Sequence, residues 1–203
     1  KKGIPQLLNK NLIADTETPF SSLVKISKGE KYSFLLESVE GGSKRGRYSL
    51  LGCDPDLIWK VNKGKTSIKY LGHKYNYKLS NNPLQGLREL IKLSQFKNID
   101  NNLPYPTLVG YLGYPMIQFM ENIKLKNTDN IKIPDATLIR PKIVAVFDNI
   151  KDILSIMCVS YPSKKVSPEN AYKNSNLLLK KTIHKLEKSI LNTKINKTKK
   201  GKL

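Results

Sequence analysis

The fold of this chain is constrained most by a series of short β-prone segments separated by turn residues. Residues 57–61 and 67–71 alternate between apolar and polar side chains and flank Asn62-Lys63-Gly64-Lys65. Asn and Gly between two alternating segments are typical of a β-hairpin. Strands joined by such short turns pair antiparallel, so the sequence predicts an antiparallel sheet. Five further segments are apolar and β-prone: 32–38, 48–53, 107–114, 138–147 and 153–160.

Helix starts lie before, between and after these segments. Thr18 precedes Pro19, Asn82 precedes Pro83, and Ser167 precedes Pro168, an arrangement that caps a helix and places proline in its first turn. Residues 116–121 are expected to form a short additional helix. The fold class is therefore predicted as α+β, with antiparallel, sandwich-like β-sheets and three or four flanking helices. Residues 1–191 are expected to form one domain, and the basic residues 192–203 a linker.

The formal net charge of +20 is consistent with a basic nucleic-acid-binding module. Only four of the 36 basic residues are Arg, however, and Arg is the side chain preferred for bidentate phosphate and base contacts. Most aromatic residues lie within apolar strands rather than among basic residues, where they could stack on bases. A solvated basic surface is the favoured interpretation, with no nucleic-acid partner. The rival predicts affinity that falls steeply with salt.

Catalytic and metal-binding patterns are absent from the sequence. Cys53 and Cys158 lie far apart, and His73 and His184 are the only histidines, so no metal-ligand spacing exists. We therefore predict no catalytic residue and no metal site in this chain. The sequence shows no secretory signal, and its longest uncharged stretch contains three prolines. It predicts a cytoplasmic protein without a membrane partner.

One segment could bind a small ligand. The apolar strand 32–38 ends in Glu37 and Ser38, and a carboxylate at the edge of a core needs a partner. That partner could be Arg45 or Arg47 in a structural ion pair, or the ammonium group of an amino acid. The residues alone favour the ion pair. The glycine-rich residues 41–46 are interpreted as a flexible turn, because a strand follows them, whereas a helix follows a phosphate-binding loop.

Several segments, taken in chain order, resemble anthranilate synthase component I. The most specific are residues 35–42 (Leu-Leu-Glu-Ser-Val-Glu-Gly-Gly) and 46–52 (Gly-Arg-Tyr-Ser-Leu-Leu-Gly). The others are residues 14–19 (Ala-Asp-Thr-Glu-Thr-Pro), 109–114 (Val-Gly-Tyr-Leu-Gly-Tyr), 119–121 (Phe-Met-Glu), 134–136 (Pro-Asp-Ala) and 146–148 (Val-Phe-Asp). Together they extend over most of residues 14–160.

This resemblance implies the N-terminal, regulatory part of an enzyme that makes anthranilate and pyruvate from chorismate, the first step of tryptophan biosynthesis. Ammonia comes from a glutamine amidotransferase subunit, component II. Magnesium and chorismate bind in a C-terminal domain that lies outside this sequence. Residues 110–121 are expected to help dock the amidotransferase.

The resemblance also implies a feedback site for L-tryptophan. Leu36, Glu37 and Ser38 carry over from the family motif, and the strand with Tyr48 and Ser49 is expected to form another wall. The fragment alone is expected to be inactive and to bind tryptophan weakly or not at all.

Two alternatives remain open besides the nucleic-acid module. One is aminodeoxychorismate synthase component I, which has the same fold and substrate. The other is a non-enzymatic amino-acid sensor.

Overall fold

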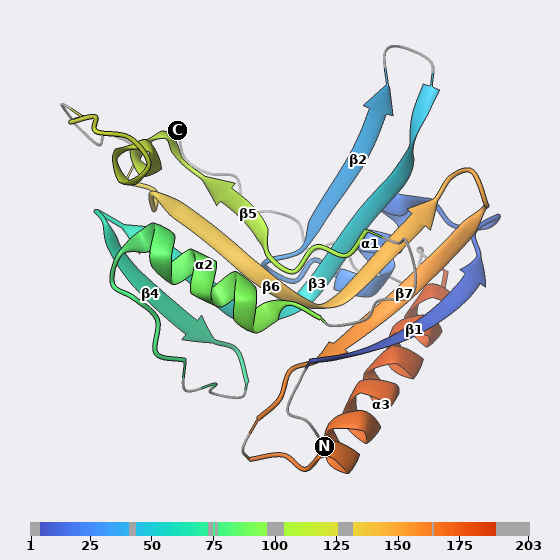
Figure 1. Ribbon diagram of the computed structural model, residues 1–203. Coiled ribbons are helices and arrows are strands. Elements are labelled where there is room, and N and C mark those ends of the chain that lie inside the picture. Colours follow the sequence, from blue (N-terminus) through green and yellow to red (C-terminus); the bar gives the residue numbers. More distant parts are fainter. Residues whose placement is uncertain are drawn as a thin grey trace, which may run out of the picture. The chain divides into compact units, whose positions relative to one another are not determined.

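The computed structural model describes residues 5–40, 44–72, 75, 77–96, 104–125, 132–163 and 165–189. In these residues seven strands form one sheet with the order β1-β7-β6-β3-β2, while β4 pairs with β3 and β5 with β6 (Figure 1). The registers of β2–β3, β3–β4, β5–β6 and β6–β7 are all antiparallel. The α+β class is confirmed. The elements are β1 (Gln6–Ile13), α1 (Pro19–Ser27), β2 (Phe34–Glu40), β3 (Lys44–Asn62), β4 (Lys65–Tyr70), α2 (Pro83–Ser94), β5 (Val109–Leu112), the 3₁₀ helix η1 (Tyr114–Phe119), β6 (Ala136–Asp148), β7 (Ile153–Ser160) and α3 (Pro168–Leu186).

Local signals in the sequence account for most element boundaries. The Thr18 hydroxyl accepts a hydrogen bond from the Ser21 N–H at the start of α1, and the Asn82 side chain accepts one from the Gln85 N–H at the start of α2. The predicted hairpin forms between β3 and β4, and Lys63 and Gly64 at its turn have positive φ angles of 49° and 72°. The main difference is β3, which runs without a break through segments 48–53 and 57–61.

The chain divides into two compact units. Unit 1 contains Lys1–Leu7, Pro55–Lys142 and Val159–Ala171, and unit 2 contains Leu8–Asp54, Ile143–Cys158 and Tyr172–Leu203. Strands β1, β3, β6 and β7 and helix α3 each contain residues of both units. No helix in the described ranges is long and apolar enough to cross a membrane.

The core of unit 1 is built around Trp59, which is fully buried. The other buried members of this cluster come from β3, α2, η1 and β6: Leu57, Val61, Leu87, Leu90, Met116 and Ala136. Burial of this many large apolar side chains is the main force that stabilises the unit.

A buried charge lies in the same unit. Both carboxylate oxygens of Asp56 accept hydrogen bonds from Arg140, at 2.8 Å from Nε and 2.7 Å from Nη2. Tyr77 Oη and Ser94 Oγ accept the bonds from Nη1, at 3.2 and 3.1 Å, and the guanidinium lies 3.5 Å from the centre of the Tyr161 ring. Asp56 is buried because β3 continues through it and carries its side chain into the interior.

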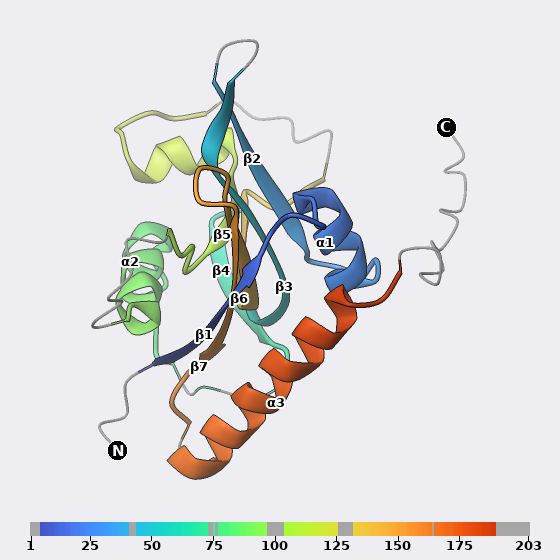
Figure 2. The same ribbon diagram turned by 90° about the vertical axis from the view of Figure 1, so that its right-hand side faces the viewer.

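The core of unit 2 is formed by α1, α3 and the parts of β3, β6 and β7 in this unit. Ile26, Leu51, Phe147, Ile156 and Leu179 are among its buried members. Figure 2 shows the C-terminal end of α3 next to α1. The Lys185 ammonium donates to the Ile26 carbonyl at 2.8 Å, so a lysine of one helix satisfies a carbonyl at the end of the other.

Candidate functional site

The predicted ligand residues lie on the antiparallel pair β2–β3 in unit 2. Leu35 is paired with Leu51, and two residues further along Glu37 is paired with Ser49. Because alternate residues of a strand point to the same face, Glu37 and Ser49 share the face on which Leu35 and Leu51 pack into the core. Leu36, paired with Leu50, lies on the opposite face.

The pairing is interrupted immediately after Glu37. The next paired residues are Val39 and Arg45, so Ser38 on β2 lies opposite residues 46–48 of β3, which have no partner in β2. Extra residues in one strand of a pair form a β-bulge. The Ser38 side chain lies directly over Gly46, where a Cβ would overlap its hydroxyl. Glycine at position 46 is thus required by the close approach of Ser38.

The five predicted residues are neighbours but do not all face one side. Leu36 is 48% exposed, Glu37 and Ser38 are exposed, Tyr48 is half-buried, and Ser49 is only 4% exposed. The expectation of a carboxylate in a buried strand is wrong for Glu37, because β2 lies at the end of the strand order and its outer part extends past the core. Among the described residues, no Lys or Arg side chain forms an ion pair with the Glu37 carboxylate.

Arg47, considered as an ion-pair partner for Glu37, binds a different carboxylate. Arg47 Nη2 lies 3.0 Å from Asp148 Oδ2, and Nε lies 3.3 Å from Oδ1. These hydrogen bonds hold the pKa of the Asp148 carboxyl below its ordinary value, and the N–H groups of Ile150 and Lys151 act in the same direction. The guanidinium also lies 4.8 Å from the centre of the Tyr48 ring. The backbone of Arg45 belongs to β3, but its side chain is not among those that the structure describes.

The turn that follows β6 contacts the same stretch of β3. The Asn149 N–H donates to the Arg47 carbonyl at 2.8 Å, and the Asn149 side-chain amide donates to the Gly46 carbonyl at 2.8 Å. Asp148 and Asn149 therefore belong to the surroundings of the site. Sequence reasoning assigned them no role, although Asp148 ends one of the family-like segments and so carried a signal.

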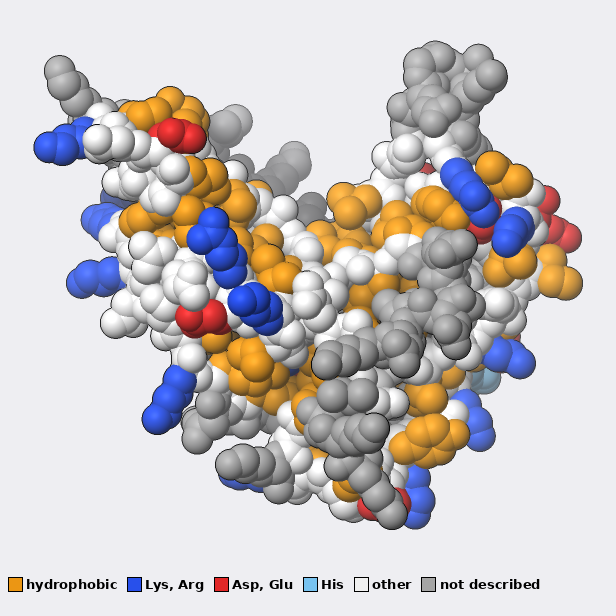
Figure 3. Space-filling view, in the orientation of Figure 1, with side chains coloured by type: hydrophobic (Ala, Val, Ile, Leu, Met, Phe, Trp, Pro, Cys, Tyr) orange, Lys and Arg blue, Asp and Glu red, His pale blue; other side chains and the backbone are white. Residues whose placement is uncertain are grey.

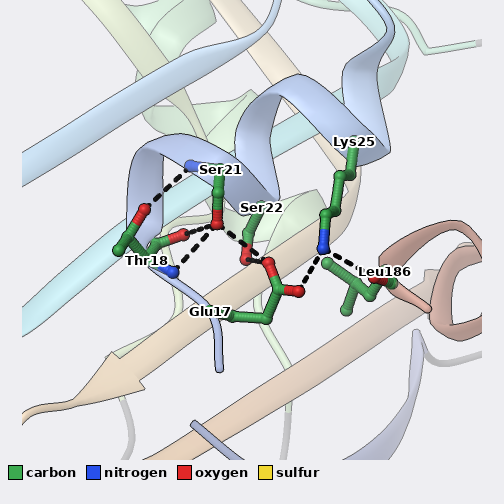
Figure 4. Close-up of polar contacts among 6 residues, drawn as sticks. All are labelled: Glu17, Thr18, Ser21, Ser22, Lys25 and Leu186. Carbon is green, nitrogen blue, oxygen red and sulfur yellow. Dashed lines mark hydrogen bonds and ion pairs between the residues drawn. The ribbon is translucent and has the colours of Figure 1, made fainter. Parts of the chain in front are cut away.

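Helix α1 packs against β2 and carries another family-like segment at its start. Figure 4 shows the Glu17 carboxylate receiving hydrogen bonds from Ser21 Oγ at 2.8 Å and Ser22 Oγ at 3.4 Å, and contacting the Lys25 ammonium. Lys25 also donates to the Leu186 carbonyl at 2.9 Å. This network ties the start of α1 to the end of α3, so Glu17 has a structural role.

No group of His, Cys, Asp and Glu side chains among the described residues could hold a metal ion. His73 and residues 192–203, the predicted linker, lie outside those residues.

A solved structure shares this fold. It is anthranilate synthase component I from Streptococcus pneumoniae, which matches 88% of this chain and 36% of its own with a TM-score of 0.50 and 18% sequence identity. The chain thus has the fold of one part of a larger synthase. No family model matches the sequence.

Sequence relatives identify the family. Anthranilate synthase component 1 of Cereibacter sphaeroides is 36% identical over 176 residues, which are 85% of this chain and 35% of the relative. The protein of the same name from Aquifex aeolicus is 30% identical over 182 residues, or 89% of this chain and 36% of the relative. The chain spans about a third of the length of these relatives. It belongs to the anthranilate synthase component 1 family and corresponds to an N-terminal part of its members.

Proposed function

We propose that this chain is the N-terminal, regulatory part of an anthranilate synthase, and that it carries most of the site at which L-tryptophan inhibits the enzyme. The whole enzyme converts chorismate, with ammonia from glutamine, into anthranilate and pyruvate in the cytoplasm. The observation that supports this most directly is the β2–β3 pair, which brings Glu37 and Ser49 opposite each other beside Ser38.

The exposed groups on this pair suit a zwitterionic amino acid. The Glu37 carboxylate is paired with none of the described cations and can receive an ammonium group. The Ser38 hydroxyl and backbone N–H groups can hold a carboxylate. Leu36 offers an apolar surface next to them, and an indole gains from contact with such a surface.

Inhibition requires coupling between two sites. Tryptophan must bind more tightly to a state in which the chorismate site is poorly formed. Chorismate and the magnesium ion on which the reaction depends are assigned to the C-terminal domain, and the residues that the structure describes offer no group of metal ligands. The remaining tryptophan contacts are assigned to that domain as well.

Calorimetric titration of L-tryptophan into the full-length natural protein tests the feedback site. The variants Ser38→Ala and Glu37→Gln are expected to weaken binding by about tenfold, because each removes a hydrogen bond or charge that holds the zwitterion. Ser67→Ala and Glu30→Gln change exposed residues outside β2 and β3 and serve as matched controls. Absence of binding by the unaltered full-length protein would refute the feedback site. The product formed from chorismate separates anthranilate synthase from the aminodeoxychorismate alternative.

The amidotransferase subunit, component II, is the proposed protein partner, and residues 110–121 of unit 1 are its proposed docking region. Large apolar side chains are exposed there, and Figure 3 shows such side chains gathered over β5 and η1. Among them are Tyr111, Leu112, Tyr114 and Met120, with Tyr114 70% exposed. Exposed apolar patches of this kind mark protein interfaces.

Co-purification of the two subunits tests this docking region. Tyr114→Ala should weaken the complex. Tyr172→Ala, which removes a similarly exposed tyrosine from α3, should leave it intact. Equal recovery of the complex with both variants would assign the interface to another surface.

A further inference from the structure

The stretch of β3 opposite Ser38 is not held by β2. Residues 46–48 have no partner in β2, because the register passes directly from Glu37–Ser49 to Val39–Arg45. Backbone groups outside a strand ladder are held by side chains, other backbone segments or water. The turn after β6 supplies two such bonds, one to the Gly46 carbonyl and one to the Arg47 carbonyl.

Three contacts connect that turn to the stretch. The Asn149 backbone N–H binds the Arg47 carbonyl, and the Asn149 side chain binds the Gly46 carbonyl, each at 2.8 Å. Both oxygens of the Asp148 carboxylate accept hydrogen bonds from the Arg47 guanidinium. The turn lies 101 residues further along the chain than Arg47, so these contacts depend on the tertiary fold.

The turn is itself held firmly. Asp148 is only 4% exposed, and its Oδ1 also accepts hydrogen bonds from the N–H groups of Ile150 and Lys151. Arg47, by contrast, is 44% exposed and reaches the carboxylate from the surface. Because Ser38 rests on Gly46, any shift of the 46–47 backbone displaces the surface on which the Ser38 hydroxyl lies.

We propose that Asp148 and Asn149 are positioning residues for the amino-acid site on β2–β3: they hold the Gly46–Arg47 backbone in the bulge that places Ser38, Tyr48 and Ser49. This inference rests on the proposed tryptophan-binding function. Neither side chain need touch the ligand. Their effect on its affinity passes through the geometry of the bulge.

Isothermal titration of L-tryptophan into the full-length protein, together with steady-state kinetics on chorismate, tests the inference. Asp148→Asn, Arg47→Gln and Asn149→Ala are each expected to weaken tryptophan binding about fivefold to tenfold, with the KM for chorismate and the kcat of the uninhibited enzyme unchanged. Asn11→Ala is the matched control. The Asn11 side chain accepts a 2.9 Å hydrogen bond from Ser155 in the same unit, away from the bulge, and its loss should leave tryptophan binding unaltered.

The double variant Arg47→Gln/Asp148→Asn distinguishes positioning from general destabilisation. If the two residues act as one unit, the affinity of the double variant for tryptophan equals that of the single variant with the lower affinity. If Asp148→Asn fails to fold, Arg47→Gln alone tests the positioning role, because it removes the same ion pair by changing the exposed partner.

Each remaining outcome has a separate meaning. An unaltered protein that does not bind tryptophan overturns the proposed function itself. An unaltered protein that binds tryptophan, with variants that bind it equally well, overturns the positioning role alone. Equal losses in tryptophan affinity and in kcat would also overturn it, since they indicate damage to the whole fold.

Discussion

Arg140 places a charge in the interior of unit 1, and this charge has to be balanced. Its guanidinium is fully buried, and its charge is balanced by Asp56 and by the faces of Tyr75, Tyr77 and Tyr161. Burial by itself lowers the pKa of an arginine. The hydrogen bonds and charge of Asp56 raise the pKa of Arg140 by more than burial lowers it, so the group stays ionised. An ionised group in such surroundings requires its counter-charge.

Removal of that counter-charge should be severely destabilising. Asp56→Ala is expected to lower the free energy of unfolding by about 3–5 kcal/mol, because Arg140 remains buried and unpaired. The double variant Asp56→Leu/Arg140→Met should lose less, since it leaves no charge in the interior. Urea-induced unfolding measures both. The exposed Asp15→Asn is the control and should stay within about 0.5 kcal/mol of the original protein. A loss below about 1 kcal/mol for Asp56→Ala would contradict the role of this pair.

Asp148 should make stability depend on pH. Its folded-state pKa is depressed, chiefly by the hydrogen bonds from Arg47, so its stabilising effect is present above the unfolded-state pKa of about 4 and is lost as pH falls through the lower folded value. The stability difference between the original protein and Asp148→Asn should therefore be largest near pH 7 and should shrink below about pH 4. Urea unfolding at both pH values measures it. A difference that stays constant or grows in acid would contradict the ion pair.

Strand β5 depends on a glycine at one position. A Cβ on Gly110 would overlap the carbonyl of Thr137 on β6, the strand with which β5 pairs. The short strand has four residues and three of them are exposed, so it has little other burial to hold it in place. Close backbone approach of this kind is why glycine occurs inside a strand.

Gly110→Ala is consequently expected to detach β5 from β6 and to destabilise unit 1 by about 1–3 kcal/mol. Gly29→Ala is a useful comparison, because Gly29 has a φ angle of 74° but open space around it. It carries only the strain of a left-handed backbone, about 1 kcal/mol. Hydrogen exchange at the β5 amides would locate the change. Protection of these amides equal to that in the original protein would rule out the predicted clash.

The chain as a whole is expected to lack synthase activity. It spans about a third of the length of its curated relatives, and the chorismate site is proposed to lie in the C-terminal domain. Purified chain incubated with chorismate, ammonia and magnesium should therefore form no anthranilate, while the full-length protein should form it readily. Fluorescence detection of anthranilate measures both. Turnover by the isolated chain would show that the catalytic groups lie within it and would overturn the proposed division of labour.

The net charge of +20 is a second property of the complete chain with a measurable consequence. If the charge serves only as a solvated surface, affinity for DNA or RNA should be weak and without sequence preference. Tight binding with a steep salt dependence would instead favour the nucleic-acid module.

Local patterns in the sequence predicted the elements well. The N-caps at Thr18 and Asn82 and the Asn62–Lys65 turn act within a few residues, so each can be recognised without the rest of the chain. The same patterns placed a false break in β3 near Pro55, because the turn tendency of Asp-Pro-Asp was overridden by sheet pairing and by the burial of Asp56 with Arg140.

The candidate site was predictable only as a set of segments. Resemblance to a family predicted Leu36 to Ser38, Tyr48 and Ser49 as ligand residues. The structure places them on the paired strands β2 and β3, and their binding of a ligand stays a prediction. The resemblance could not predict that Arg47 pairs with Asp148, nor that Asn149 binds the Gly46 carbonyl. These partners are about a hundred residues apart in the sequence.

The sequence by itself therefore determined most of the secondary structure, the α+β class and the family, since propensities, caps and turns are local and the family-like segments are continuous in the chain. Only the tertiary structure decided which charges meet, that Glu37 is exposed and that Asp56 is buried. The reason is geometric: strand order sets which distant side chains lie within hydrogen-bond distance, and no local periodicity specifies that order.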